Sequence, residues 1–216
     1  MPSIQNPMIK LKNISATPKF SRTSAMPGLS WSLEARTTCP GSIDTDGELV
    51  DACSTCYAAK GFYRMPTVKA VRDHNKEDWK HDDWIDVMVQ EVDNVRYFRW
   101  FDSGDCYHID LARKILEVMK RTPNTNHWFP TRQHKFKKFL PVLKEMQSLD
   151  NVVVRWSSDG INGEIIEGDC TSTIVQNWSQ APVNVKKCTK PDNNGKCGSC
   201  RSCWDKSTKT VAYLWH

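Results

Sequence analysis

The chain has 216 residues, of which 39% are hydrophobic and 25% charged, and it carries a formal net charge of +5 at pH 7. This length is sufficient for one domain whose core needs no disulfide or metal to be stable. The chain contains no run of about eighteen apolar residues, which excludes a membrane-spanning helix. Lys and Arg are interleaved with Asp and Glu along most of the chain, so the positive excess indicates a solvated surface more than a nucleic-acid-binding one.

The first twenty residues do not have the composition of a signal peptide. Lys10, Lys12 and Lys19 are present, but an apolar segment of the required length is not. We therefore expect a cytoplasmic protein, in which thiols stay reduced. The chain has nine cysteines, an odd number that cannot pair completely within one chain. In a reducing compartment, so many cysteines favour metal ligation over a disulfide framework.

Residues 1–28 are predicted to form an irregular arm, because they are polar and contain four prolines. A short strand is expected within this arm around residues 8–11. Residues 29–216 are predicted to form a single α/β domain. Its first strand is expected over residues 31–36, which alternate between apolar and polar side chains, and this strand leads into Cys39.

Helical and strand patterns alternate through the middle of the chain. Residues 66–92 have a helical pattern, within which Asp82 or Asp83 is the expected helix cap. A strand over residues 95–101 is followed by a helix that ends at Pro123, and a helix containing residues 136–146 comes later. This alternation predicts βα units around a parallel sheet. Further strands are expected over residues 126–130, 151–156, 172–175, 183–186 and 210–215.

Three cysteines, which we call the first cysteine set, follow the first predicted strand. They are Cys39, Cys53 and Cys56, with the spacing C-x13-C-x2-C. Cys53 and Cys56 are expected in the first turn of a helix, where the helix N-terminus lowers the thiol pKa and favours thiolate ligands. We interpret the set as metal-binding because a second group of cysteines occurs in the same chain. The alternative is a C-x2-C that merely begins a helix, with Cys39 as a small buried side chain.

The second cysteine set comprises Cys188, Cys197, Cys200 and Cys203, and the last three have the spacing C-x2-C-x2-C. A single zinc ion usually takes ligand pairs from separate segments, so three thiols this close are hard to bring onto one ion. A [4Fe–4S] cluster is larger and suits three cysteines from one turn with a fourth from elsewhere. The spacing therefore favours an iron–sulfur cluster; the alternatives are zinc, a disulfide and free thiols.

Polar residues follow the predicted strands, which is where functional residues collect in parallel α/β proteins. The strand over residues 95–101 leads to Ser103-Gly104-Asp105, and the two that follow lead to Arg132 and Asp159. The strand over residues 183–186 leads to Cys188. If the sheet is parallel, these residues and both cysteine sets meet at one edge. The alternatives are that Asp105 and Asp159 cap helices and that Arg132 pairs with a surface carboxylate.

Five motifs follow the predicted strands or lie in the C-terminal segment: Thr38-Cys39-Pro40, Cys53-x2-Cys56-Tyr57-Ala58, Ser103-Gly104-Asp105, Thr131-Arg132 and the cysteine-rich stretch from Gly195 to Trp204. Together they resemble the phage gene product 88 family, and the resemblance covers most of residues 30–216. This family is in turn similar to radical S-adenosylmethionine enzymes, of which it looks like a distant, shortened relative.

The resemblance implies a partial, incomplete TIM-like βα barrel with parallel strands and a cysteine-rich C-terminal segment. It implies that the first cysteine set binds a [4Fe–4S] cluster with one open iron. Ser103-Gly104-Asp105 then stands in the place of the Gly-Gly-Glu that holds S-adenosylmethionine, and Arg132 joins these cofactor-binding candidates. The chain departs from the pattern in its first cysteine spacing, thirteen residues rather than three, and in Asp105, which replaces Glu. Radical activity is therefore left open.

We interpret the chain as an iron–sulfur protein of the host cytosol, with one or two clusters and a redox or structural role. One alternative is a zinc-stabilised nucleic-acid-binding module, although the chain has no basic stripe and no zinc-finger spacing. Another is a structural phage protein that uses the metal to hold its fold. Cys106 and Cys170 lie outside both sets and are expected to be free thiols. The cysteines of the second set are expected to support folding, and Asp105 only ligand binding.

Overall fold

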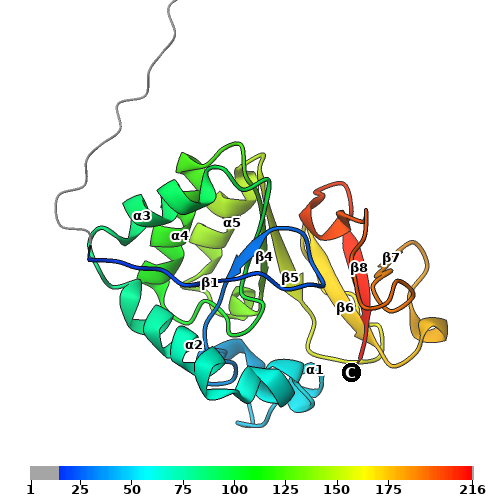
Figure 1. Ribbon diagram of the computed structural model, residues 1–216. Coiled ribbons are helices and arrows are strands. Elements are labelled where there is room, and N and C mark those ends of the chain that lie inside the picture. Colours follow the sequence, from blue (N-terminus) through cyan, green and yellow to red (C-terminus); the bar gives the residue numbers. More distant parts are fainter. Residues whose placement is uncertain (1–14, 216) are drawn as a thin grey trace, which may run out of the picture.

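A sheet of eight strands forms the centre of the protein in the computed structural model, which describes residues 15–215 (Figure 1). The strand order is β1-β2-β3-β4-β5-β6-β8-β7. β1 pairs antiparallel with β2, and all the other pairs are parallel. The sheet is open, because within residues 15–215 each of its two edge strands pairs with one neighbour. The strands are β1 (Phe20–Ser21), β2 (Leu29–Trp31), β3 (Tyr97–Trp100), β4 (Asn126–Thr131), β5 (Val152–Ser157), β6 (Thr171–Val175), β7 (Lys186–Lys187) and β8 (Thr210–Leu214).

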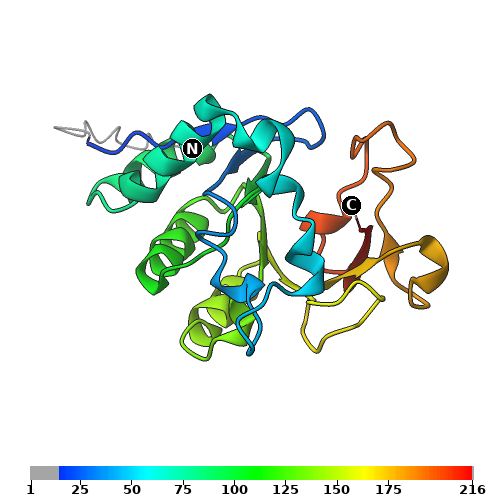
Figure 2. The same cartoon turned by 90° about the horizontal axis from the view of Figure 1, so that it is seen from below.

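Helices cover one face of this sheet, and the cysteine-rich C-terminal segment lies on the other side (Figure 2). The prediction of an α/β fold with a mostly parallel sheet is thereby confirmed, while a closed barrel is absent from the described residues. Among residues 15–215, no helix combines the length and the hydropathy needed to cross a bilayer. The helices are α1 (Asp51–Ser54), α2 (Pro66–Asp78), α3 (Trp84–Val92), α4 (Ile109–Arg121) and α5 (Leu140–Ser148).

Successive side chains of each strand face opposite sides of the sheet, and this separates apolar from polar residues. In β3, Phe98 and Trp100 are fully buried in the core, whereas Arg99 lines a cavity on the opposite face. The helices pack on the apolar face of the sheet through stripes of apolar residues, which are three and four positions apart in the sequence. In α4 the apolar stripe is entirely buried, and it includes Leu111, Ala112, Ile115, Leu116 and Met119.

A neutral histidine is enclosed in this core. His127 of β4 is fully buried, and its Nδ1 accepts a hydrogen bond from the indole N–H of Trp100 at 3.3 Å. Its Nε2 lies 2.9 Å from the hydroxyl of Thr122. Because Thr122 donates its own proton to the carbonyl of Val118, the proton on His127 is at Nε2. Burial lowers the pKa of His127 to about 3.

Some predicted element boundaries are wrong. The strand expected over residues 31–36 ends at Trp31, because the N–H of Leu33 bonds to the carbonyl of Ser103, beyond the end of β3. The helix pattern over residues 66–92 is two helices, α2 and α3, separated by a turn. Asp83 precedes α3, but its carboxylate accepts from the backbone N–H groups of Ser15 and Ala16 instead of capping the helix. The strand expected over residues 183–186 is β7, shifted towards Cys188.

The N-terminal arm is attached to the domain. β1 extends the sheet, so the arm is not wholly irregular. The side chain of Asn75 in α2 bonds to both the backbone N–H and the carbonyl of Lys19, at 2.9 Å each. The strand expected around residues 8–11 lies outside the described residues.

Candidate metal centre

The carboxyl ends of the parallel strands surround a cavity of about 520 Å³, which we call the central cavity. Its wall includes members of both cysteine sets, although the sets are separated by more than a hundred residues in the chain. The two sets therefore meet at one edge of the sheet, as the sequence predicts. The cysteines that line the cavity are Cys39, Cys53, Cys56, Cys188, Cys197 and Cys203.

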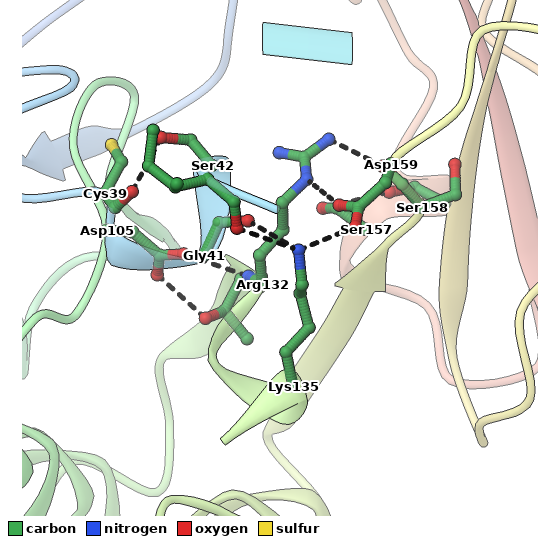
Figure 3. Close-up of polar contacts among 12 residues, drawn as sticks. Cys39, Gly41, Ser42, Asp105, Arg132, Lys135, Ser157, Ser158 and Asp159 are labelled. Atoms are coloured by element: carbon green, nitrogen blue, oxygen red, sulfur yellow. Dashed lines mark hydrogen bonds and ion pairs between the residues drawn. The ribbon is translucent and has the colours of Figure 1, made fainter. Parts of the chain in front are cut away.

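A tight loop holds Cys39 at the cavity. Cys39 precedes a single 3-10 turn, and its carbonyl accepts both the N–H and the hydroxyl of Ser42, at 2.9 and 2.7 Å. The loop lies directly on the end of β4, because a Cβ at Gly41 would come within 2.5 Å of the Cβ of Arg132. Only glycine permits this approach. Figure 3 shows Cys39 beside Asp105 and Arg132 in this arrangement.

Cys53 and Cys56 are positioned by the end of β5. The N–H of Ala52, in the single turn α1, donates to the carbonyl of Asp159 at 2.9 Å. Cys56 N–H donates to the carbonyl of Cys53 at 3.2 Å, which closes the C-x2-C turn. The hydroxyl of Tyr57 then donates to the carbonyl of Asp102 after β3, at 2.7 Å. Three strand ends thus fix the loop that carries the first cysteine set.

Ser103-Gly104-Asp105 braces this loop from the end of β3. The hydroxyl of Ser103 donates to the carbonyl of Leu33 at 2.7 Å, and the N–H of Asp105 donates to the carbonyl of Thr38 at 3.1 Å. Gly104 has a φ of +74°, and a Cβ there would lie 2.6 Å from the Thr38 hydroxyl and 2.8 Å from the Leu33 carbonyl. The three residues are thus packed against the backbone that leads to Cys39, although they also line the central cavity.

The carboxylate of Asp105 joins the ends of β3 and β4. One oxygen accepts from the N–H of Cys106 at 2.7 Å and the hydroxyl of Thr131 at 2.8 Å. The other accepts from the N–H of Arg132 at 2.9 Å. Burial raises the pKa of Asp105, against the opposing effect of these hydrogen bonds. The alternative in which Asp105 caps the next helix is wrong, because His108 accepts from the first turn of α4.

Arg132, Asp159 and Lys135 form a charged network (Figure 3). The charges of Arg132 and Asp159 act on Cys53. Arg132 Nε lies 3.1 Å from a carboxylate oxygen of Asp159, and its terminal nitrogen donates to the carbonyl of Ser158 at 2.6 Å. Lys135 pairs with the second oxygen of Asp159 at 2.7 Å and donates to the carbonyl of Gly41 at 3.1 Å. The ion pair that was the alternative interpretation of Arg132 is thus present. Asp159 caps no helix, since the described chain continues from it to β6 without one.

Two thiols of the first set, Cys39 and Cys53, are held in their protonated form. Burial and the carboxylate of Asp105 raise the pKa of Cys39 well above its usual range. Burial also raises the pKa of Cys53, and the positive charge of Arg132 opposes it only in part. The expectation that a helix N-terminus lowers the pKa of Cys53 is wrong, because α1 is a single turn. A metal would have to displace these protons on binding.

The four cysteines of the second set all line one small hollow of about 20 Å³. Cys188 directly follows β7, and its N–H donates to the carbonyl of Ala212 in β8 at 2.9 Å. Cys200 N–H donates to the carbonyl of Cys197 at 3.0 Å, which closes the first turn of the C-x2-C-x2-C run. Cys197 N–H donates to the carbonyl of Ala25 at 2.8 Å, so the arm contributes to the position of this set.

The sulfurs of Cys200 and Cys203 in this set have hydrogen-bond partners. Cys203 Sγ lies 3.1 Å from the hydroxyl of Tyr213. Burial raises the pKa of Cys203 to about 11, although the hydrogen bond with Tyr213 lowers it. At Cys200 burial also acts to raise the pKa, but hydrogen bonds with Ser202 outweigh it and leave the pKa lowered.

Arg155, which the sequence analysis missed, fastens the C-terminal segment to the sheet. It is fully buried in β5, and its guanidinium donates to the carbonyls of Thr171 at 2.8 Å and Ser202 at 3.1 Å, among others. Trp204 adds a hydrogen bond from its indole N–H to the carbonyl of Phe98 at 3.0 Å. The sequence signal that could have identified it is an arginine within an otherwise apolar strand. Such a charge is buried only when backbone carbonyls or carboxylates accept its hydrogen bonds.

The donor chemistry of both sets fits a metal that prefers thiolates, as zinc and iron–sulfur clusters do. Within residues 15–215, no three His, Cys, Asp or Glu side chains converge closely enough to hold a single metal ion. All nine cysteines are free of disulfides. Cys106 and Cys170 are buried and lie outside both sets, and their assignment as free thiols stays a prediction.

Both cysteine sets and the strand-end motifs lie within the span of one family model. The model, described as gene product 88, matches residues 7–206. The chain belongs to this family. The predicted membership is confirmed, and the match also includes much of the N-terminal arm, which the resemblance had left out. No curated protein and no solved structure matches this member of the gene product 88 family.

Proposed function

We propose that this protein is an iron–sulfur protein in which the second cysteine set holds a [4Fe–4S] cluster. The observation that carries the proposal is that all four cysteines of this set line one hollow at the end of β7. Three of them come from a single C-x2-C-x2-C turn and the fourth from a separate segment, which is a division of ligands that suits a cubane cluster. A bound cluster would supply one-electron redox chemistry or a rigid link between the C-terminal segment and the sheet.

The residues around the second set support this assignment. The hydroxyl of Tyr213 lies within hydrogen-bond distance of Cys203, and the Ser202 hydroxyl lies 3.4 Å from the sulfur of Cys200. Donors of this kind stabilise the negative charge of metal-bound thiolates. Arg155 brings a buried positive charge to the same region and lowers the pKa of Cys203. Such groups would stabilise the reduced, more negative state of a cluster more than its oxidised state.

We further propose that the first cysteine set holds a second cluster with three thiolates. The open sheet with helices on one face would then correspond to the partial βα barrel of radical S-adenosylmethionine enzymes. Three ligands leave one iron of a [4Fe–4S] cluster accessible to a small molecule, and S-adenosylmethionine is a candidate. The side chain of Ser103 is engaged with the backbone that leads to Cys39, and that of Asp105 with Thr131 and Arg132 at the end of β4. This favours a redox or structural role for the cluster over radical chemistry.

The test is elemental analysis of protein purified without oxygen. We expect iron and acid-labile sulfide in near-equal amounts, together with the broad visible absorption of thiolate-ligated clusters. Cys200→Ser should lose the iron of the second set and Cys53→Ser that of the first. Cys170→Ser is the matched control, because Cys170 is a buried cysteine outside both sets. Zinc without sulfide, even after anaerobic reconstitution, would contradict the proposal and favour a zinc-stabilised fold.

The two single variants also distinguish a protein with one shared cluster from a protein with two clusters. If each set holds its own cluster, each variant keeps about half of the iron, because the other set is intact. If both sets share a single cluster, either variant loses nearly all of it. Formation of 5′-deoxyadenosine from S-adenosylmethionine after reduction, dependent on Cys53, would show radical activity and overturn the preference for a redox or structural role.

A further inference from the structure

A positively charged side chain in the central cavity forms no ion pair with a carboxylate of residues 15–215. Arg99 comes from the middle of β3, on the face of the sheet opposite the helices. Its guanidinium carbon lies 4.4 Å from the ring centre of Trp128. One terminal nitrogen is 3.1 Å from the sulfur of Met26, and the other is 3.4 Å from the hydroxyl of Tyr57. The arginine is thus held in place by a thioether and two aromatic side chains.

These contacts leave the hydrogen-bond donors of Arg99 poorly satisfied. A guanidinium has five N–H donors, and a thioether sulfur is a weak acceptor. The Nε–H group is buried without a hydrogen-bond partner. No carboxylate of residues 15–215 forms an ion pair with Arg99. Asp102 follows the same strand and its charge acts on Arg99 from a distance, but its carboxylate accepts from the hydroxyls of Ser32 and Tyr63 and forms no ion pair with Arg99.

Two neighbouring arginines show how this protein satisfies such groups elsewhere. Arg155 donates to several backbone carbonyls, and Arg132 pairs with Asp159 and a carbonyl. Arg99 differs from both in having neither a carbonyl nor a carboxylate among its contacts. Removing a guanidinium from water without giving it strong hydrogen-bond acceptors raises the free energy of the folded protein. An anion bound in the cavity would supply those acceptors.

We propose that the central cavity binds a small organic anion whose carboxylate or phosphate group pairs with Arg99. Arginine takes both groups through two parallel hydrogen bonds. The cavity volume of about 520 Å³ suits a small molecule. Aromatic side chains line the wall next to Arg99, so the body of the ligand is flat and apolar. Those aromatic residues are Tyr57, Tyr63, Trp128, Tyr213 and Trp215.

Lys190, an exposed residue, adds a second positive charge to the lining of the same cavity.

Anion binding at Arg99 goes beyond the proposed iron–sulfur clusters and does not depend on them. Arg99 belongs to neither cysteine set, and the side chains around it are in place without a bound cluster. Iron measured in the same samples therefore separates a failure of this proposal from a failure of the cluster proposal.

The test is calorimetric titration of the full chain, purified without oxygen, with phenyl phosphate, benzoate and neutral benzyl alcohol. We expect the two anions to bind saturably and the alcohol at least about tenfold more weakly, because only the anions can pair with Arg99. Arg99→Gln should weaken anion binding by about tenfold or more. Arg96→Gln is the matched control, because Arg96 is an exposed arginine just before the same strand, and it should bind like the wild type.

Three results would overturn the proposal: no saturable binding of either anion to the wild type, equal binding of benzyl alcohol, or equal losses in Arg99→Gln and Arg96→Gln. Circular dichroism establishes whether each variant folds. If Arg99→Gln does not fold, Arg99→Lys replaces it, since lysine keeps the charge but not the two-pronged geometry. Anion binding by Arg99→Lys should then be weaker than in the wild type, and unchanged binding would contradict the proposal.

Discussion

The hydroxyl of Tyr213 lies 3.1 Å from the sulfur of Cys203 and links strand β8 to the second cysteine set. A hydroxyl that donates to a cluster ligand stabilises the reduced, more negative state. If the second cysteine set holds the cluster proposed above, Tyr213→Phe should therefore make its midpoint potential more negative. A hydrogen bond worth about 1 kcal/mol corresponds to roughly 40 mV for a one-electron couple.

The measurement is a redox titration followed by electron paramagnetic resonance. Tyr107→Phe is the control, because Tyr107 has a hydroxyl that bonds to Trp79 and not to a cysteine. An unchanged potential in Tyr213→Phe, with full iron content, would show that this hydroxyl does not act on a cluster ligand.

Gly104→Ala should destabilise the protein by roughly 2–4 kcal/mol, because the new methyl group would collide with the Leu33 carbonyl and the Thr38 hydroxyl. Gly47→Ala is the matched control. Gly47 also has a positive φ, +86°, but a Cβ added there would have no atom within 4 Å. Gly47→Ala should therefore lower the free energy of unfolding by only roughly 1–2 kcal/mol, which is the cost of placing alanine in the left-handed backbone conformation. Urea unfolding followed by circular dichroism measures both, and equal losses would rule out the collision.

Asp105→Ala should lower the free energy of unfolding by about 2–4 kcal/mol. The substitution leaves the hydroxyl of Thr131 and the N–H groups of Cys106 and Arg132 buried without their acceptor. Asp110→Ala should change stability by less than about 1 kcal/mol, because the Asp110 ion pair with Arg113 is exposed. The same urea experiment measures both variants. A wild-type stability for Asp105→Ala would support the expectation from the sequence that Asp105 acts only in ligand binding.

His127 should make the protein less stable as the pH falls below about 6.5. Its pKa is lowered from 6.5 to about 3 by burial, so between these values the unfolded chain binds a proton that the folded chain does not. Protonation would place a second N–H at Nδ1, opposite the indole N–H of Trp100. The loss should reach roughly 2–3 kcal/mol at about pH 4.5.

The measurement for His127 is the urea midpoint between neutral pH and pH 4.5. His127→Gln cannot titrate, so its stability should fall by less over the same interval. An equal fall in the variant and the wild type would assign the acid sensitivity to other groups.

Local patterns in the sequence were sufficient for much of the fold. The apolar stripe of α4 and the alternating strands follow from side-chain periodicity, which depends only on near neighbours in the chain. Cysteine spacing likewise pointed to the two groups that contribute to the lining of the central cavity, and their role as metal ligands stays a prediction. Errors arose where a distant contact decided the outcome. Asp83 binds Ser15 and Ala16 instead of capping α3, and the strand at Trp31 ends where Leu33 turns to Ser103.

Only the tertiary structure decided what the strand-end residues do. Ser103-Gly104-Asp105 has the composition of a binding loop, yet its contacts brace the backbone that leads to Cys39. Arg99 is one charge among many in the sequence, and only the packing of Trp128 and Met26 around it leaves it facing a cavity. The physical reason is the same in both cases. Hydrogen bonding and burial depend on groups brought together from distant parts of the chain, and no periodicity or spacing encodes them.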